Sequence, residues 1–123
     1  MIKKTYDLTE FAERERISNE IYDNSYCVND NEKYMVGMVR LDVNRCDMED
    51  DSTRIVVEVY KLPDGCHDLD VVARDADPFM GFVLDDVSTA RALVDFTLSH
   101  FRAESPFDEA WDHVCDFWEQ MGA

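Results

Sequence analysis

The sequence predicts an α+β fold: an N-terminal helix, a three- to four-stranded antiparallel sheet and two C-terminal helices. Segments near both ends of the chain have helical composition or helical spacing of apolar residues, whereas the middle alternates apolar and polar residues. Turn-forming residues separate the alternating segments at short intervals, which favours hairpins. Because its 123 residues contain no repeat or linker, the chain is predicted to form a single domain, residues 1–123.

The first helix is predicted to begin near Asp7, because Asp7 and Glu10 stand in the relation of a capping box. The segment "LTEFAERERISNEIYD", residues 8–23, follows with helical composition. Its apolar residues divide between two sides: Ile17 and Ile21 lie away from the face shared by Leu8, Phe11, Ala12 and Tyr22. The polar stretch "DNSYCVNDNEK", residues 23–33, is predicted to supply a turn region.

The sheet is predicted from period-two alternation in the middle of the chain. In "KYMVGMVRLDV", residues 33–43, one face carries Met35, Val39, Leu41 and Val43. In "TRIVVEVYKL", residues 53–62, one face carries Ile55, Val57 and Val59. The polar segment between them, residues 44–52, is then a hairpin loop. Beyond a turn at residues 63–65, "LDVVAR" (69–74) and "FMGFVL" (79–84) are two further short strands.

Two helices are predicted for the C-terminal third. The first begins near residues 85–88, and its apolar stripe consists of Val87, Ala90, Val94, Leu98 and Phe101. The second has Ser105 as N-cap and Pro106 at its first position. Its apolar face carries Phe107, Ala110, Trp111, Val114, Trp118 and Met121.

The charge of the chain indicates its class of partner. The sequence has 28 acidic and 12 basic residues, a net charge of −16, whereas small soluble domains usually carry a net charge of about 2–8. Such a field repels nucleic acids and anionic membranes and attracts cationic surfaces, of which those of nucleic-acid-binding proteins are the commonest. We therefore expect a basic nucleic-acid-binding protein as partner, with no direct binding to nucleic acid or membrane.

The compartment is predicted from the N-terminus and the cysteines. No apolar signal-peptide core follows Met1, and no apolar run approaches the length of a membrane span. The four cysteines form no CxxC pair, which is typical of reduced thiols. These features predict a cytoplasmic protein, in the host cytoplasm if a phage encodes it.

The acidic residues gather in three clusters. The loop after residue 46 carries Asp47, Glu49, Asp50 and Asp51. The last predicted helix carries Asp108, Glu109, Asp112, Asp116 and Glu119, with no lysine or arginine after Arg102. These five charges follow one another at roughly 3.3 Å along a helix, close to the spacing of about 3.4 Å between phosphates of one DNA strand. A third group consists of Asp68, Asp70, Asp75, Asp77, Asp85 and Asp86.

Metal and catalytic sites are less well supported by the sequence. Asp47, Glu49, Asp51 and Glu58 match positions one, three, five and twelve of a calcium loop. The match fails because Ser52 replaces the required glycine and Arg54 places a cation inside the loop. The pairs Cys66–His67 and His113–Cys115 do not have the spacing of zinc ligands. Since no glycine-rich elbow or phosphate loop is present, we expect a protein that is not an enzyme and has no cofactor.

The acidity, the α+β pattern and the lack of catalytic motifs together resemble small phage-encoded anti-CRISPR and antirestriction proteins that mimic DNA. The stretch "SYCVNDNEKYMVGMVRL", Ser25 to Leu41, is also similar to acidic type II anti-CRISPR inhibitors that occupy the site where Cas9 reads its PAM. Its spacing differs around "NEKY", so no functional residues are transferred through it. The resemblance implies a stoichiometric inhibitor whose carboxylates replace phosphates in a basic groove of a Cas effector or restriction enzyme.

The leading hypothesis is therefore a non-enzymatic inhibitor with a negative docking surface. The residues expected to contact the partner are Asp47, Glu49, Asp50, Asp51, Asp108, Asp112, Asp116 and Glu119. Three alternatives remain open: an immunity-type protein that neutralises a cationic toxin, a small metal-binding module or enzyme built on the Asp47–Asp51 loop, and an acidic subunit of an oligomer. The oligomeric state is not predicted.

Overall fold

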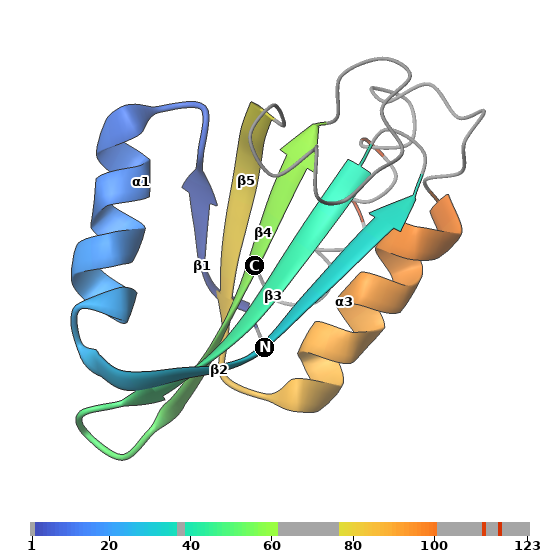
Figure 1. The fold of residues 1–123 in the computed structure, drawn as a ribbon. Coiled ribbons are helices and arrows are strands. Elements are labelled where there is room, and N and C mark those ends of the chain that lie inside the picture. Colours follow the sequence, from blue (N-terminus) through green and yellow to red (C-terminus); the bar gives the residue numbers. More distant parts are fainter. Residues whose placement is uncertain (1, 37–38, 62–76, 101–111, 113–115, 117–123) are drawn as a thin grey trace.

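The computed structural model describes residues 2–36, 39–61, 77–100, 112 and 116 (Figure 1). Within these residues, five strands form one antiparallel sheet in the order β1-β5-β4-β3-β2. The strands are β1 (Ile2–Asp7), β2 (Ser25–Val36), β3 (Val39–Met48), β4 (Thr53–Lys61) and β5 (Asp77–Leu84). The chain runs back and forth from β2 to β5, and β1 pairs with β5 at the edge.

Helices lie on both faces of the sheet, which confirms the α+β class (Figure 1). Helix α1 (Phe11–Ile17) continues into a π-helical turn, η1 (Ser18–Tyr22), and packs on one face. Helix α3 (Val87–His100) packs on the other face. We call these the α1 face and the α3 face of the sheet.

Each face has its own apolar core, because successive residues of a strand point to opposite faces. On the α3 face the buried residues are Val39, Leu41, Ile55, Val57, Val59, Phe82, Leu84, Ala90, Leu93 and Val94. On the α1 face they are Tyr6, Leu8, Ile17, Ile21, Cys46, Met48, Val56 and Val83. The predicted inward face of the strand over residues 53–62 is confirmed, and Val56 is buried on the opposite face as well.

Two strands differ from the prediction. Strand β1 was not expected, because most of "IKKTYD" is polar; only Tyr6 among its described side chains is buried, at 1% exposure. Strand β2 occupies most of the region that we predicted to be a turn, residues 23–33. Its register with β3 shifts twice, between Ser25 and Cys27 and between Asn29 and Glu32. An edge strand with such bulges accommodates polar residues that a central strand excludes.

The predicted strand over residues 33–43 is in fact two strands. Its first part belongs to β2 and its second to β3, and Val36 pairs with Val39 across the connection. Met35, expected beside Val39 on one face, therefore lies on the neighbouring strand opposite Arg40. The alternation itself was right for the second part, where Val39 and Leu41 are fully buried.

The helices also begin and pack differently from the prediction. Helix α1 begins at Phe11 and the predicted capping box is not formed, because the Asp7 carboxylate accepts hydrogen bonds from the amide and hydroxyl of Thr9. In α3, Leu93 and Thr97 are buried whereas Val87 is 52% exposed, so the buried stripe is rotated relative to the predicted one.

Three predicted elements lie outside the described residues: the turn at 63–65, the strand at 69–74 and most of the second C-terminal helix. Within that last element, Asp112 and Asp116 are described, and both are helical and exposed. None of the helices in the described part of the chain has the length and hydropathy to cross a membrane.

Candidate functional site

The acidic loop is a tight hairpin turn between β3 and β4, but it is shorter than predicted. Strand β3 extends to Met48, so residues 44–48 of the predicted loop, Asp47 included, belong to the strand. The Met48 amide donates to the Ser52 carbonyl at 2.9 Å, and the Asp51 amide donates to the Met48 carbonyl at 3.0 Å. Asp51 has φ 67°, the left-handed conformation that closes a three-residue hairpin loop. The carboxylates of Glu49, Asp50 and Asp51 are thus exposed on a turn held by backbone hydrogen bonds.

Two acidic side chains of this turn have structural partners. The Asp50 carboxylate accepts hydrogen bonds from the hydroxyl and the amide of Ser52, and these bonds lower the pKa of Asp50. The Asp47 carboxylate accepts a 2.6 Å hydrogen bond from the Asn29 amide group of β2. The Asp50 bonds fix the turn, and the Asp47 bond fixes its base to the neighbouring strand.

The turn is also anchored to the α1 layer. The Glu49 amide donates to the carbonyl of Asn24 at 2.9 Å, just after η1. The Asn24 side chain in turn donates to the carbonyls of Asn19 and Glu20. Backbone contacts on two elements therefore hold the tip of the hairpin.

A second acidic group reaches the same end of the sheet. Leu84, the last residue of β5, pairs with Ile55 near the start of β4, so Asp85 and Asp86 follow at the end where the β3–β4 turn protrudes (Figure 1). Asp86 caps α3, since its carboxylate accepts hydrogen bonds from the amide and hydroxyl of Thr89 at 2.6 and 2.7 Å. We call this region, Asp47 to Asp51 together with Asp85 and Asp86, the acidic end of the sheet.

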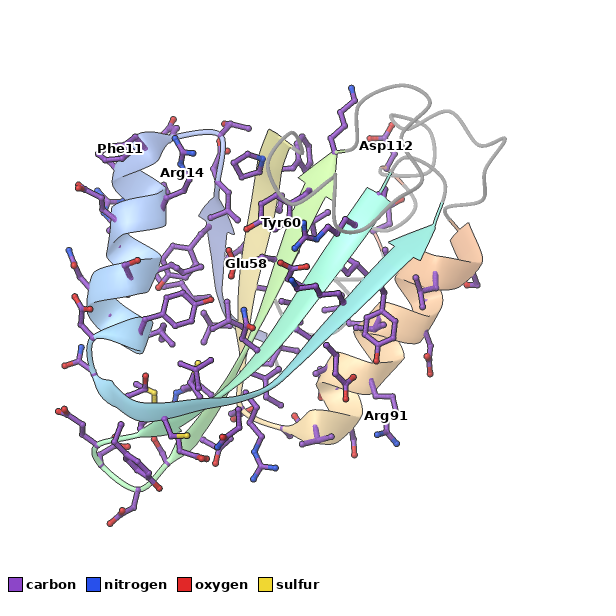
Figure 2. All side chains as sticks on the ribbon, in the orientation of Figure 1. Phe11, Arg14, Glu58, Tyr60, Arg91 and Asp112 are labelled. Carbon is purple, nitrogen blue, oxygen red and sulfur yellow. The ribbon has the colours of Figure 1, made fainter. Side chains whose placement is uncertain are left out.

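The C-terminal acids are placed elsewhere. Asp112 lies near the other end of the sheet, far from the β3–β4 turn (Figure 2). Asp116 is helical and exposed, and Asp108 and Glu119 lie outside the described residues. Of the eight residues predicted to contact a partner, the structure therefore brings together four: Asp47 near the end of β3, and Glu49, Asp50 and Asp51 in the turn.

The described residues contain no group of three or more histidine, cysteine, aspartate or glutamate side chains able to hold a metal ion. Glu58, twelfth in the calcium-loop spacing, lies in the middle of β4, where its partners are tyrosine and asparagine side chains. The geometry thus gives no support to a calcium loop at residues 47–58.

A polar network on the α1 face was not predicted from the sequence. The Glu58 carboxylate accepts a hydrogen bond from Tyr22 at 2.6 Å, from Tyr60 at 3.0 Å and from Asn44 at 3.2 Å. Burial, and then the Glu58 carboxylate, raise the pKa of both tyrosines far above the ordinary value. The network joins η1 to the two central strands, and Glu58 and Tyr60 lie over the middle of the sheet (Figure 2).

A buried ion pair adjoins this network. Asp42 pairs directly with Glu58 across the strands, an arrangement of like charges that is unfavourable without compensation. Arg40 supplies the compensating positive charge. Its guanidinium donates two hydrogen bonds to Asp42 at 2.8 and 2.9 Å and lies 5.5 Å from the centre of the Tyr60 ring. Arg40 is 5% exposed and Asp42 is 8% exposed.

Apart from one atom of Asn44, these polar residues satisfy one another's hydrogen bonds, which indicates a structural role. Among the described residues, the Asn44 Oδ1 atom is the buried side-chain oxygen or nitrogen that lacks a partner. Alternation within residues 40–44 and 56–60 is enough to put the strand residues of this network on the same face of the sheet. The sequence did not show that η1 adds Tyr22 to that face. Hydrogen bonds between segments that are distant in sequence cannot be predicted from local sequence patterns.

None of the protein-family models, curated proteins or solved structures compared with the chain matches it. Its function is therefore inferred from the charge and geometry of its own residues.

Proposed function

We propose that the protein is a non-enzymatic inhibitor that binds a cationic, nucleic-acid-binding surface of a partner protein through the acidic end of its sheet. The observation that carries the proposal is the set of exposed carboxylates, Glu49, Asp50 and Asp51, on a hydrogen-bonded turn in a chain of net charge −16. Lysine and arginine side chains that normally bind phosphates would bind these carboxylates instead.

The anchoring of the turn supports a binding role. A rigid turn loses little conformational entropy when a partner immobilises it, so more of the electrostatic attraction contributes to affinity. The backbone bonds of Met48, Glu49 and Asp51 and the side-chain bonds of Asp50 provide this rigidity before binding. A merely solubilising cluster has no need of such fixed geometry.

The partner class follows from the sign and the extent of the charge. A Cas effector or a restriction enzyme, which the sequence resemblance implies, presents an extended basic groove. Because Asp112 lies at the other end of the molecule from the turn (Figure 2), a groove long enough to reach both would contact Asp112 as a second area. The β3–β4 turn is the primary contact in this proposal.

The experiment is a competition between the protein and DNA for purified basic DNA-binding enzymes, including a Cas9 nuclease and a type I restriction enzyme. We expect one-to-one protection of the DNA from cleavage and an affinity that falls steeply with NaCl concentration. Affinity that is unchanged between low and moderately high salt would contradict an electrostatic contact.

Charge-matched variants locate the contact surface. In the turn variant, Glu49→Gln, Asp50→Asn and Asp51→Asn remove three charges while the amides keep the shape of the side chains. In the control variant, Glu10→Gln, Glu15→Gln and Asp95→Asn remove three exposed charges from the N-cap of α1, from α1 and from α3. We expect the turn variant to bind about tenfold more weakly than the control. Equal weakening by both variants would exclude the turn as the contact surface.

A further inference from the structure

A cavity of about 330 Å³ lies between the α3 face of the sheet and residues 87–95 of α3. Its floor is apolar and aliphatic, and consists of Val43, Ile55, Ala90 and Val94 from β3, β4 and α3. Ile55, Ala90 and Val94 are buried, and Val43 is half-buried. The volume falls within the range of about 300–1,000 Å³ that is typical of small-molecule sites.

The spacing of residues along each element explains how the cavity forms. On α3, positions 87, 90, 91, 94 and 95 follow one another at helical intervals and so share one face of the helix. On β2, Glu32 and Tyr34 are two residues apart, and Glu32 pairs with Val43 across the strands. These β2 side chains therefore point to the α3 face, as Val43 does. The cavity lies where the edge strand β2 meets α3.

The rim of the cavity carries charges of both signs. Glu32, Arg91 and Asp95 are exposed, and the hydroxyl of the half-buried Tyr34 donates a hydrogen bond to the Glu32 carboxylate. This bond, and then burial, raises the pKa of Tyr34, while the Arg91 charge lowers that pKa and the Asp95 charge raises it. Both charges of α3 therefore lie within electrostatic reach of the Tyr34 hydroxyl.

Arg91 and Asp95 do not neutralise each other. They lie one turn apart on α3 (Figure 2 shows Arg91), but within the described part of the chain neither forms an ion pair. The order of the charges accounts for this, because on a helix the favourable order has the acidic residue first and the basic residue four positions later. Arg45 also lines the cavity, but it has other interactions and is assigned no role.

A ligand with a single charge fits this rim poorly. Glu32 and Asp95 would repel the head group of an anion, and Arg91 would repel that of a cation. A zwitterion places one charge against each sign, and its zero net charge avoids repulsion by a chain of net charge −16. The aliphatic floor requires an apolar body on the same molecule.

We propose that this cavity binds a small zwitterion, an α-amino acid with a branched aliphatic side chain. The ligand carboxylate binds the Arg91 guanidinium, its ammonium group binds the carboxylates of Asp95 and Glu32, and its side chain lies on the apolar floor. The site does not rest on the proposed function, which concerns the β3–β4 turn.

The first test compares four molecules on the unmodified protein by calorimetric and NMR titration. L-leucine is the probe, and each of three relatives lacks one part of it: isocaproate lacks the ammonium group, isoamylamine lacks the carboxylate, and glycine lacks the aliphatic side chain. We expect one L-leucine per chain and binding of each relative that is weaker by about tenfold or more. Absence of L-leucine binding, or equal affinity for L-leucine and any one relative, would overturn the proposal.

Two variants assign the charged groups of the site. Arg91→Gln should weaken the binding of L-leucine and isocaproate about tenfold, because a charge-assisted hydrogen bond to the ligand carboxylate is lost. It should not weaken the binding of isoamylamine, which has no carboxylate. Asp95→Asn should show the opposite selectivity, with weaker binding of L-leucine and isoamylamine but not of isocaproate.

Matched controls change the same kinds of residue on α1, across the sheet from the cavity. Arg14→Gln and Glu15→Gln remove exposed charges there and should alter L-leucine binding less than about twofold. Circular dichroism checks that each variant is folded. Equal losses for Arg91→Gln and Arg14→Gln, or equal weakening of isocaproate and isoamylamine by one variant, would exclude the proposed contacts.

Discussion

Asp50 and Asp51 are adjacent in the β3–β4 turn, but they differ in what holds them there. Asp50 accepts hydrogen bonds from Ser52, whereas Asp51 adopts a left-handed backbone conformation at φ 67°. That conformation is unfavourable for residues with a Cβ atom, although aspartate tolerates it better than most. The sequence cluster thus contains one residue that stabilises the turn and one that the turn strains.

Replacement of Asp51 by glycine should stabilise the fold. Relief of the left-handed conformation outweighs the larger entropy of glycine in the unfolded chain, so we expect the free energy of unfolding to rise by about 0.5–1 kcal/mol. Urea denaturation of the two proteins measures this change in the free energy of unfolding. Asp50→Ala is the control, because it removes the same charge but also the bonds to Ser52, and it should lower the free energy of unfolding. Similar effects of the two variants would mean that charge, not backbone conformation, governs the turn.

The hydroxyl of Tyr22 should contribute measurably to the stability of the fold. It donates to the Glu58 carboxylate at 2.6 Å in a partly buried environment. Tyr22→Phe should lower the free energy of unfolding by about 2 kcal/mol, because hydrogen bonds to charged groups contribute about 1.5–3 kcal/mol. Tyr34→Phe removes a comparable bond to the exposed Glu32 and should have a much smaller effect. If both variants lose equal stability, the network on the α1 face is not specially stabilising.

A buried thiol and two buried tyrosine hydroxyls should make the stability of the fold depend on pH in the alkaline range. Burial, with the Glu58 and Asp47 charges, raises the pKa of the Cys46 thiol from 9.0 to about 11, and burial followed by Glu58 raises the pKa of Tyr22 and Tyr60. The unfolded chain therefore releases these protons at lower pH than the folded chain. Their contribution to stability is complete below pH 9 and is lost as the pH rises through the folded-state values.

Urea midpoints measured between pH 8 and pH 11 should consequently fall as the pH rises above 9. Tyr22→Phe should make the fall above pH 10 less steep, since one of the shifted groups is absent. A midpoint that stays constant over this range would contradict the burial of these groups.

At the scale of elements, Gly81 of β5 controls how closely α1 approaches the sheet. A Cβ atom at this position would lie 2.9 Å from Cδ1 of Ile17 and 3.4 Å from both δ-carbons of Leu8. The absence of a side chain at Gly81 therefore lets α1 and the β1–α1 connection pack against the α1 face.

Gly81→Ala should lower the free energy of unfolding by about 1–3 kcal/mol, the usual cost of overpacking. Ile17→Val removes the Cδ1 atom that the new methyl group meets. The double variant should therefore lose less stability than the sum of the two single variants, as thermal or urea unfolding of all four proteins would show. Additive losses would contradict the contact between Ile17 and position 81.

The elements that sequence patterns predicted well were those with a simple periodicity. Strand β4 was predicted within a residue, because alternation is a local signal. The hairpin turn before it was predicted in the right place but five residues too long, because the polar residues 44–48 belong to β3. Strand β1 and residues 25–32 of β2 were missed because both strands lie at an edge of the sheet and have many polar residues, and they become strands only by pairing with β5 and β3. Edge strands leave a weaker mark in sequence than central ones.

For the whole molecule, the net charge of −16 should oppose folding through self-repulsion. NaCl screens this repulsion, so the melting temperature should rise between about 10 mM and 300 mM NaCl, most steeply at the low end. The variant with Glu49→Gln, Asp50→Asn and Asp51→Asn should show a smaller rise, because three of the repelling charges are gone. A melting temperature that does not depend on NaCl would show that the acidic groups are too far apart to repel one another appreciably.

The α+β class, the acidity and a β3–β4 hairpin turn with Glu49, Asp50 and Asp51 could be predicted from the sequence alone, because composition and period-two alternation are properties of short segments. Only the tertiary structure decided which acids share a surface. The antiparallel register brings Asp85 and Asp86 to the end that carries the turn, while Asp112 lies at the opposite end. Such groupings depend on contacts between segments distant in sequence, which strand order and register create.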